Sequence, residues 1–182
     1  MTGLWAQKHL AALQVRSDKK QDGINAMKNA VYAFIKAGAR EEFVQRAFDG
    51  FSGRVPMERI DSFVVSDLFA VPNVAMDLAR TGDYKVVVAA GYVEEDPAWQ
   101  HSHFLSQSVT NGLMRVGLDT GVLVLSILAC PKVAPENAQQ HQVMLEHFHA
   151  KGRQAADAVL QISKLKASLP ALRQFLERLW PV

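Results

Sequence analysis

The sequence predicts an α/β fold in which a short parallel sheet lies between two layers of helices. Two apolar runs, Lys85–Ala90 and Val122–Leu128, each follow a glycine-containing turn, and the segment Phe104–Thr120 between them has the pattern of a helix. Near-continuous apolar strands that alternate with amphipathic helices are typical of parallel strands buried on both faces. We therefore expect a three-layer α/β/α domain with a short four-stranded sheet, flavodoxin-like in its winding.

The first third of the chain carries weaker patterns. Leu10–Val15 predicts a short strand, and Asp22–Ala37 predicts a helix that ends at Gly38, a typical C-terminal cap. The helix prediction rests on apolar residues that share one helical face: Ile24, Met27, Val31, Phe34 and Ile35. Ala39–Arg59 has partial helical spacing that glycine and proline interrupt, so we interpret it as a helical insertion.

The rest of the chain alternates strands and helices more clearly. Asp61–Val65 predicts a strand from its β-branched and aromatic residues, and Pro72–Arg80 predicts a helix with proline in its first turn. From Glu136 to Leu165 the apolar spacing predicts one long or broken helix. A last helix is predicted over Ser168–Trp180, because serine suits its N-cap and an early proline its first turn.

These elements predict one domain over residues 1–166, with the insertion at 39–59, and a C-terminal helical extension over 167–182. The extension is amphipathic, and its apolar stripe needs a partner in the same or a neighbouring subunit. The stripe consists of Leu172, Phe175, Leu176 and Leu179.

The composition excludes several classes of protein. Hydrophobic residues make up 49% of the 182 residues and the formal net charge is +2, which is typical of a globular chain. The basic residues are scattered, so we do not expect nucleic acid as a partner. The longest apolar run, Val122–Cys130, is about half a membrane span, which argues against a membrane protein. A single cysteine and the absence of a signal-like start predict a cytoplasmic protein.

His101 is the first candidate for chemistry. It lies in the segment Tyr92–His103, which leaves the carboxyl end of the predicted strand Lys85–Ala90. Doubly wound sheets bind ligands at the carboxyl ends of their strands. An unperturbed imidazole titrates near pH 6.5, so His101 could both accept and return protons; the alternative is a solvent-facing loop histidine.

Several runs carry a resemblance to a known family: Leu78-Ala-Arg-Thr-Gly-Asp-Tyr84, Val86-Val-Val-Ala-Ala-Gly91, Leu118-Asp-Thr-Gly-Val122 and Ala150-Lys-Gly152. The chain resembles lumazine synthase, and Gly121-Val-Leu-Val-Leu-Ser126 is most similar to the decameric second type of that family. The resemblance implies the lumazine synthase fold, a homo-pentamer or decamer with sites between subunits, and no metal or organic cofactor. It also implies condensation of 5-amino-6-ribitylaminouracil with 3,4-dihydroxy-2-butanone 4-phosphate, a step of riboflavin biosynthesis.

The resemblance also implies roles for individual residues. His101 aligns with the acid/base histidine, Lys151 with a lysine near the uracil, and His141 with the arginine that binds phosphate. The other residues implied in substrate binding are Ser66, Asp67 and Leu68 in the turn after a strand, Trp99 as a substitute for the stacking aromatic, and Ser126. Asp67 could instead cap the following helix, and Lys151 could be a surface cation.

The departures from the family pattern leave alternatives open. Ala70 stands where the family has glutamate, and the acidic run Glu94-Glu-Asp-Pro-Ala98 replaces its phosphate loop. A related enzyme that acts on a substrate without phosphate is one alternative, and a non-catalytic ligand-binding or shell protein is another. A metal site is not expected, because His147 and His149 would point about 200° apart on a helix.

Overall fold

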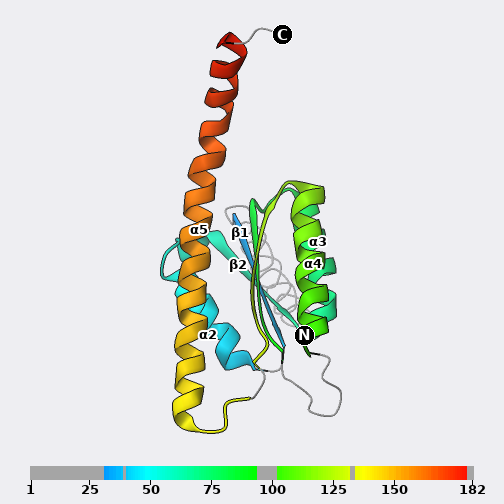
Figure 1. Ribbon diagram of the computed structural model, residues 1–182, viewed down its shortest axis with the longest axis vertical. Helices are drawn as coiled ribbons and strands as arrows, with labels where there is room; N and C mark the ends of the chain where they lie inside the picture. Colours follow the sequence, from blue (N-terminus) through cyan, green and yellow to red (C-terminus); the bar gives the residue numbers. More distant parts are fainter. Residues whose placement is uncertain (1–30, 39, 94–101, 132–133, 180–182) are drawn as a thin grey trace, which may run out of the picture.

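A four-stranded parallel sheet lies between two pairs of helices (Figure 1). The computed structural model describes residues 31–38, 40–93, 102–131 and 134–179. The elements in chain order are β1 (Tyr32–Gly38), α2 (Glu41–Ser52), β2 (Ile60–Val65), α3 (Val71–Thr81), β3 (Val86–Tyr92), α4 (Ser102–Thr120), β4 (Leu123–Ala129) and α5 (Ala138–Leu179). Short 3-10 turns occupy Met57–Arg59 and Leu68–Ala70. The three-layer α/β/α prediction is confirmed.

The strand order is β2-β1-β3-β4, and each face of the sheet has its own core. Side chains such as Phe34 and Val88 face α2 and α5, whereas Ile35 and Val87 face α3 and α4. All seven residues of β3 are buried. This burial on both faces explains why β3 is a continuous apolar run. The predicted strands and helices from Asp61 to Thr120, and the strand near Val122–Leu128, are confirmed within one or two residues.

The predicted helix over Asp22–Ala37 is wrong at its carboxyl end, because Tyr32–Gly38 form β1. Val31, Phe34 and Ile35 fit helical spacing, but β1 lies between β2 and β3 and is buried on both faces. A short apolar run of this kind has no period that separates strand from helix. The strand predicted at Leu10–Val15 lies outside the described residues, so β1 is the first strand that the structure describes.

The segment read as an insertion is helical, as predicted, but α2 is the crossover between β1 and β2. Phe43 and Phe51 are fully buried in the core on that side of the sheet. The helix lies so close to α5 that a Cβ added to Gly50 would overlap the carbonyl of His149, and one added to Gly152 would overlap the carbonyl of Ala47. Over residues 40–59 the interpretation as an insertion is therefore corrected.

The two helices predicted after Glu136 are one helix, α5. Ser168 does not begin a new helix, because its hydroxyl donates a 2.7 Å hydrogen bond to the carbonyl of Leu165 one turn earlier. A serine inside a helix can bond back to the preceding turn, so serine followed by proline does not always mark a start. Pro170 lies inside the helix. In the described part of the chain, no helix is long and apolar enough to cross a membrane.

Candidate active site

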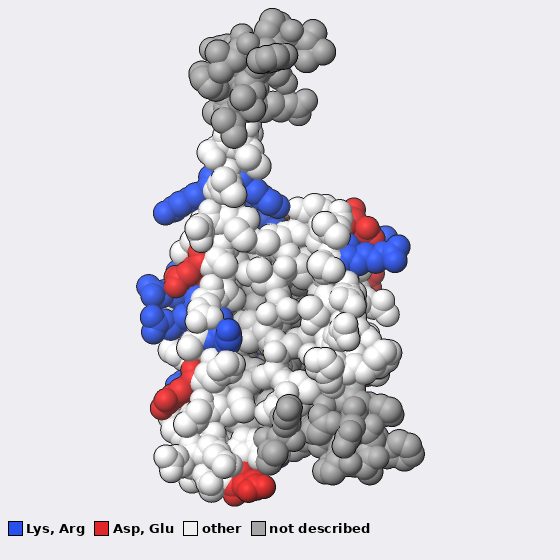
Figure 2. All heavy atoms as spheres, in the orientation of Figure 1, with Lys and Arg blue, Asp and Glu red and all other residues white. Residues whose placement is uncertain are grey.

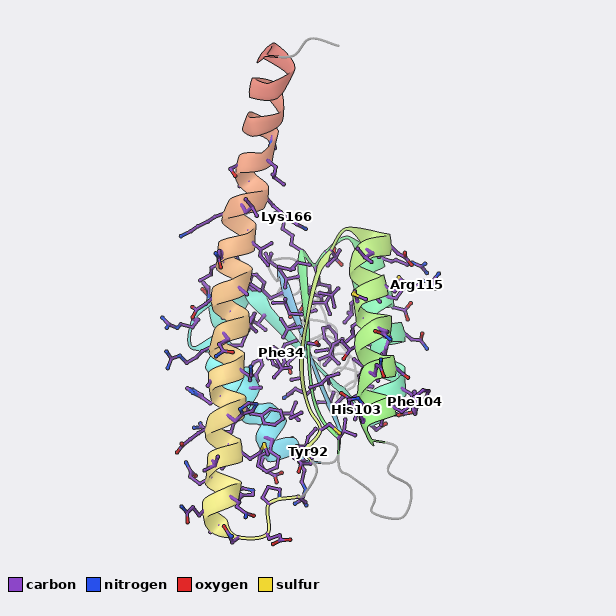
Figure 3. All side chains as sticks on the ribbon, viewed as in Figure 1. Phe34, Tyr92, His103, Phe104, Arg115 and Lys166 are labelled. Carbon is purple, nitrogen blue, oxygen red and sulfur yellow. The ribbon has the colours of Figure 1, made fainter. Side chains whose placement is uncertain are left out.

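The carboxyl ends of the four strands lie at one edge of the sheet, which we call the carboxyl edge. Gly38 of β1 pairs with Tyr92 of β3, and Tyr92 pairs with Ala129 of β4. Ala37 pairs with Val65, the last residue of β2. This edge lies at the lower end of Figure 3, where Tyr92 is labelled. The ligand crevice of a doubly wound sheet forms at such an edge.

A glycine turn places Arg40 at the carboxyl edge. Gly38 has φ +98°, and an added Cβ would lie 2.6 Å from the carbonyl oxygen of Tyr92, so only glycine fits. The chain then enters α2, where the carbonyl of Arg40 accepts hydrogen bonds from the amides of Phe43 (3.2 Å) and Val44 (3.4 Å). Arg40 is half-buried. The turn therefore places Arg40 beside the end of β1.

His141, near the start of α5, packs on the aromatic side chains of this edge. Its ring lies 4.9 Å from that of Phe43, measured between centroids, and the Phe43 ring lies 5.0 Å from that of Tyr92. Its Nε2 is 3.5 Å from Oε1 of Glu42, and both side chains remain about two-fifths exposed. The contact is an ion pair when the imidazole is protonated. His141 is thus held at the carboxyl edge, where its side chain is partly exposed and its Nε2 contacts Glu42.

The turn after β2 contains Ser66, Asp67 and Leu68. Ser66 and Asp67 are exposed, and the Asp67 carboxylate accepts a 2.9 Å hydrogen bond from the amide of Phe69. Asp67 therefore caps the turn that leads into α3. Leu68 is buried and packs against Gly91, where an added Cβ would lie 2.7 Å from Leu68 Cδ2. The structure thus assigns Leu68 to the core and Asp67 to a cap.

Ser126 and Lys151 lie away from His141 within one chain. Ser126 lies midway along the edge strand β4, where it pairs with Ala89, and it lines a groove of about 450 Å³ between α4 and β4, which Lys166 also lines. Lys151 is exposed on α5, ten residues after His141. At 1.5 Å per residue the two side chains are separated by about 15 Å along the helix. A single chain does not bring Lys151 to the site of His141.

His101, Trp99 and the acidic run Glu94–Ala98 lie outside the described residues. The chain that contains them leaves the carboxyl edge at Val93 and enters α4 at Ser102. His103 is exposed in the first turn of α4, and Figure 3 shows it at the same end of the molecule as Tyr92. Among the described residues, no group of three or more His, Cys, Asp or Glu side chains could hold a metal ion.

Known proteins share this sequence over most of its length. Residues 29–167 match the family model of 6,7-dimethyl-8-ribityllumazine synthase. The chain belongs to the lumazine synthase family. A relative of that name from Rhodococcus erythropolis is 38% identical over 76% of this chain and 92% of its own length. The resemblance predicted from the sequence motifs is confirmed.

Two further relatives are named 6,7-dimethyl-8-ribityllumazine synthase 2. The one from Pseudomonas syringae pv. tomato is 32% identical over 70% of this chain and 78% of its own length. The one from Bradyrhizobium diazoefficiens is 30% identical over 76% and 88%, respectively. The matched range of the lumazine synthase family includes β1 and α2, which the sequence patterns had interpreted as a helix and an insertion.

Sequence reasoning missed three residues at this candidate site: Arg40, Glu42 and Phe43. The signal for Arg40 is a cation just after a strand that ends in glycine, and it was hidden because the strand was taken for a helix. No local signal identifies Glu42 or Phe43, since their contacts with His141 span almost a hundred residues. The carboxyl edge therefore has an imidazole and a carboxylate beside one aromatic cluster, and Arg40 follows the strand that ends there.

Proposed function

We propose that this protein forms 6,7-dimethyl-8-ribityllumazine from 5-amino-6-ribitylaminouracil and 3,4-dihydroxy-2-butanone 4-phosphate in riboflavin biosynthesis. The observation that carries the proposal is the family match over residues 29–167, which includes all four strands and the crossovers between them. We place the reaction in the cytoplasm, where a chain with a single cysteine needs no disulfide.

The reaction needs positioning and proton transfer more than it needs a cofactor. The amine of the pyrimidine attacks the ketone, water leaves as the imine forms, phosphate is eliminated, and ring closure releases a second water. Each step moves a proton near neutral pH, which suits an imidazole. We assign this acid/base role to His101, which the sequence places in the segment between β3 and α4.

We assign the phosphate to the part of the carboxyl edge that carries Arg40 and His141. A guanidinium can donate two parallel hydrogen bonds to a phosphate, and a protonated imidazole can donate one. His141 is supported by the Phe43 ring and remains accessible. Glu42, 3.5 Å from His141, adds a negative charge beside the proposed anion site.

We propose that a second subunit completes the site in a homo-pentamer or decamer. Ser126 and Lys151 do not lie with His141 in one chain, so a neighbouring copy would have to bring them together with it. Three large apolar side chains of α4 are exposed on one face: Phe104 (68%), Met114 (60%) and Leu118 (78%). In Figure 2 the surface between α5 and α4 carries charged residues only at its margins. A surface of this kind fits a subunit contact.

A substrate without phosphate remains the second candidate, since a carboxylate, Glu42, contacts the imidazole that would bind the anion. In this case His141 would contact Glu42 rather than an anion, and the phosphorylated ketone would have no advantage over its dephosphorylated form. Comparison of the two ketones as substrates separates the candidates.

The test is a direct assay of the purified protein with both lumazine synthase substrates. We expect the lumazine chromophore to form faster than in the uncatalysed reaction, and His101→Ala to reduce the rate to that background. His147→Ala, an exposed histidine on α5, is the matched control and should keep the wild-type rate. A wild-type rate equal to the background with every substrate pair would contradict the proposed activity.

A further inference from the structure

The C-terminal part of α5 projects beyond the domain, and we call residues 163–179 the arm. Figure 1 shows this part of the helix continuing past the sheet and past α3 and α4. Ile162 is half-buried, whereas every residue from Ser163 to Pro170 is exposed. The family match ends at residue 167. Residues 168–179, the larger part of the arm, therefore lie beyond the matched range of the lumazine synthase family.

The base of the arm is attached to the domain by Lys166. Its Nζ donates a 3.0 Å hydrogen bond to the carbonyl oxygen of Gly121, which follows the last residue of α4. A cation at the carboxyl end of a helix also interacts favourably with the helix dipole. Figure 3 shows the Lys166 side chain directed from α5 toward the sheet and α4. This contact gives the arm a defined direction where it leaves the domain.

The arm carries a heptad repeat of apolar residues. Their spacing alternates between three and four residues: Ile162, Leu165, Leu169, Leu172, Leu176 and Leu179. Leu165 and Leu169 are 58% and 46% exposed, so the arm's own domain does not cover them. A repeat of 3.5 residues keeps an apolar seam against a second helix that supercoils with the first, whereas a helix on a membrane surface presents a wider apolar face.

We propose that the arms of neighbouring copies of this chain pair with one another as a parallel coiled coil. With Ile162, Leu169 and Leu176 at the first heptad position, Lys166 and Arg173 fall at the fifth position. Gln161, Ser168 and Phe175 fall at the seventh. An antiparallel pair would place the two basic positions against each other, whereas a parallel pair places them against uncharged residues. This charge pattern favours the parallel arrangement.

Pro170 does not obstruct the seam. It follows Leu169, at the second heptad position, and therefore lies outside the contact between paired helices. If the arms of a ring of identical subunits run along its axis, they all point the same way, so a parallel coiled coil to which each subunit contributes one helix is compatible with cyclic symmetry. The inference does not depend on the proposed activity.

Disulfide trapping in the full-length protein tests the pairing. Cys130 is the only cysteine and would be replaced by serine. In that background, Leu169→Cys places a thiol on the seam and Gln174→Cys places one on the outer side of the arm. Parallel pairing brings the same seam position of two chains within the range of a disulfide. We expect Leu169→Cys to form covalent dimers under mild oxidation at least fivefold faster than Gln174→Cys.

A second pair of variants measures the assembly itself. Leu169→Glu with Leu176→Glu introduces charge on the seam, whereas Ala167→Glu with Gln174→Glu introduces the same charge on the outer side. Only the seam pair should raise the protein concentration at which half of the oligomer dissociates, by tenfold or more. The circular dichroism spectrum should stay unchanged. Equal cross-linking of the two cysteine variants, or equal dilution behaviour of the two glutamate pairs, would overturn the proposal and leave another segment or a different partner to cover the seam.

Discussion

Tyr84 donates a 2.7 Å hydrogen bond to Oδ2 of Asp61 and thereby joins the chain that enters β3 to the edge strand β2. The strand β1 lies between these two strands, so the bond crosses one position of the sheet. The Tyr84 ring also meets Phe63 edge to face, with centroids 6.0 Å apart. This contact stabilises the amino ends of the strands, at the edge opposite to the proposed active site.

Tyr84→Phe should lower the free energy of unfolding by about 1–2 kcal/mol, because it removes a hydrogen bond to a charged group. Burial, followed by the hydrogen bond and charge of Asp61, raises the pKa of the Tyr84 hydroxyl above its usual value. The contribution of the bond is therefore fully present below about pH 10 and lost as the pH rises toward the folded-state pKa. Denaturant titrations of both proteins from pH 7 upward should show the difference shrinking only at alkaline pH.

Gly152→Ala should destabilise the protein by about 3 kcal/mol, because the new methyl group would push α5 away from the Ala47 carbonyl of α2. Gly117→Ala in α4 is the matched control, since its nearest atom would be the Val122 carbonyl oxygen at 3.4 Å. Alanine favours helices over glycine by about 1 kcal/mol, so the control should be neutral or stabilising. Similar melting temperatures for the two variants would contradict this account of helix packing.

Asp67→Ala should cost about 1 kcal/mol of folding free energy, whereas Asp67→Asn should retain most of the cap. Both expectations follow from the bond between the Asp67 carboxylate and the Phe69 amide. Thermal unfolding measures the cap, and the Michaelis constants for both substrates measure a ligand role. A large rise in a Michaelis constant for the stable asparagine variant would show that Asp67 binds substrate as well.

His141→Ala should raise the Michaelis constant for the phosphorylated ketone roughly tenfold, which corresponds to the loss of one charge-assisted hydrogen bond. The Michaelis constant for the pyrimidine should change little. In the control variant His147→Ala, the Michaelis constants for both substrates should change little. Steady-state kinetics with one substrate varied at a time make this comparison. An unchanged constant for the ketone would remove His141 from the phosphate site.

Mixed assemblies test whether two chains share one site. At a ketone concentration well below the Michaelis constant, co-expressed His141→Ala and Lys151→Ala chains should be more active than either variant alone, because some interfaces then combine an intact His141 with an intact Lys151. Random mixing in a symmetric oligomer predicts recovery of roughly a quarter of the wild-type rate. Recovery would be absent if both residues acted within one chain, despite their separation along α5.

The sequence predicted those parts of the fold where pattern and burial agree. β3 is buried along its whole length and was recognisable from its unbroken apolar run. β1 has a similar environment, but Val31, Phe34 and Ile35 also fit a helix, and only pairing with β2 and β3 decides between the two. Because β1 was not recognised as a strand, α2 was interpreted as an insertion rather than as the crossover between two strands. The prediction that this segment is helical was correct.

The sequence also predicted only part of the candidate site. The motifs identified the family, and the position of His141 followed from them, but its contacts with Glu42 and Phe43 come from a helix almost a hundred residues away. Asp67 carried two interpretations, and the hydrogen bond to Phe69 establishes the cap. The substrate-binding role of Leu68 stays a prediction, and its side chain packs on Gly91 in the core.

The sequence by itself determined the α/β class, the family and the heptad spacing of the arm, because these depend on residue types at short, regular intervals. Tertiary structure alone decided that residues 32–38 form a strand, that α2 packs on α5 through Gly50 and Gly152, and that Arg40 and His141 both belong to the carboxyl edge. The physical reason is the distance along the chain over which each kind of interaction acts. Periodicity acts over a few residues, whereas strand pairing and helix contact join segments whose separation along the chain leaves no local trace.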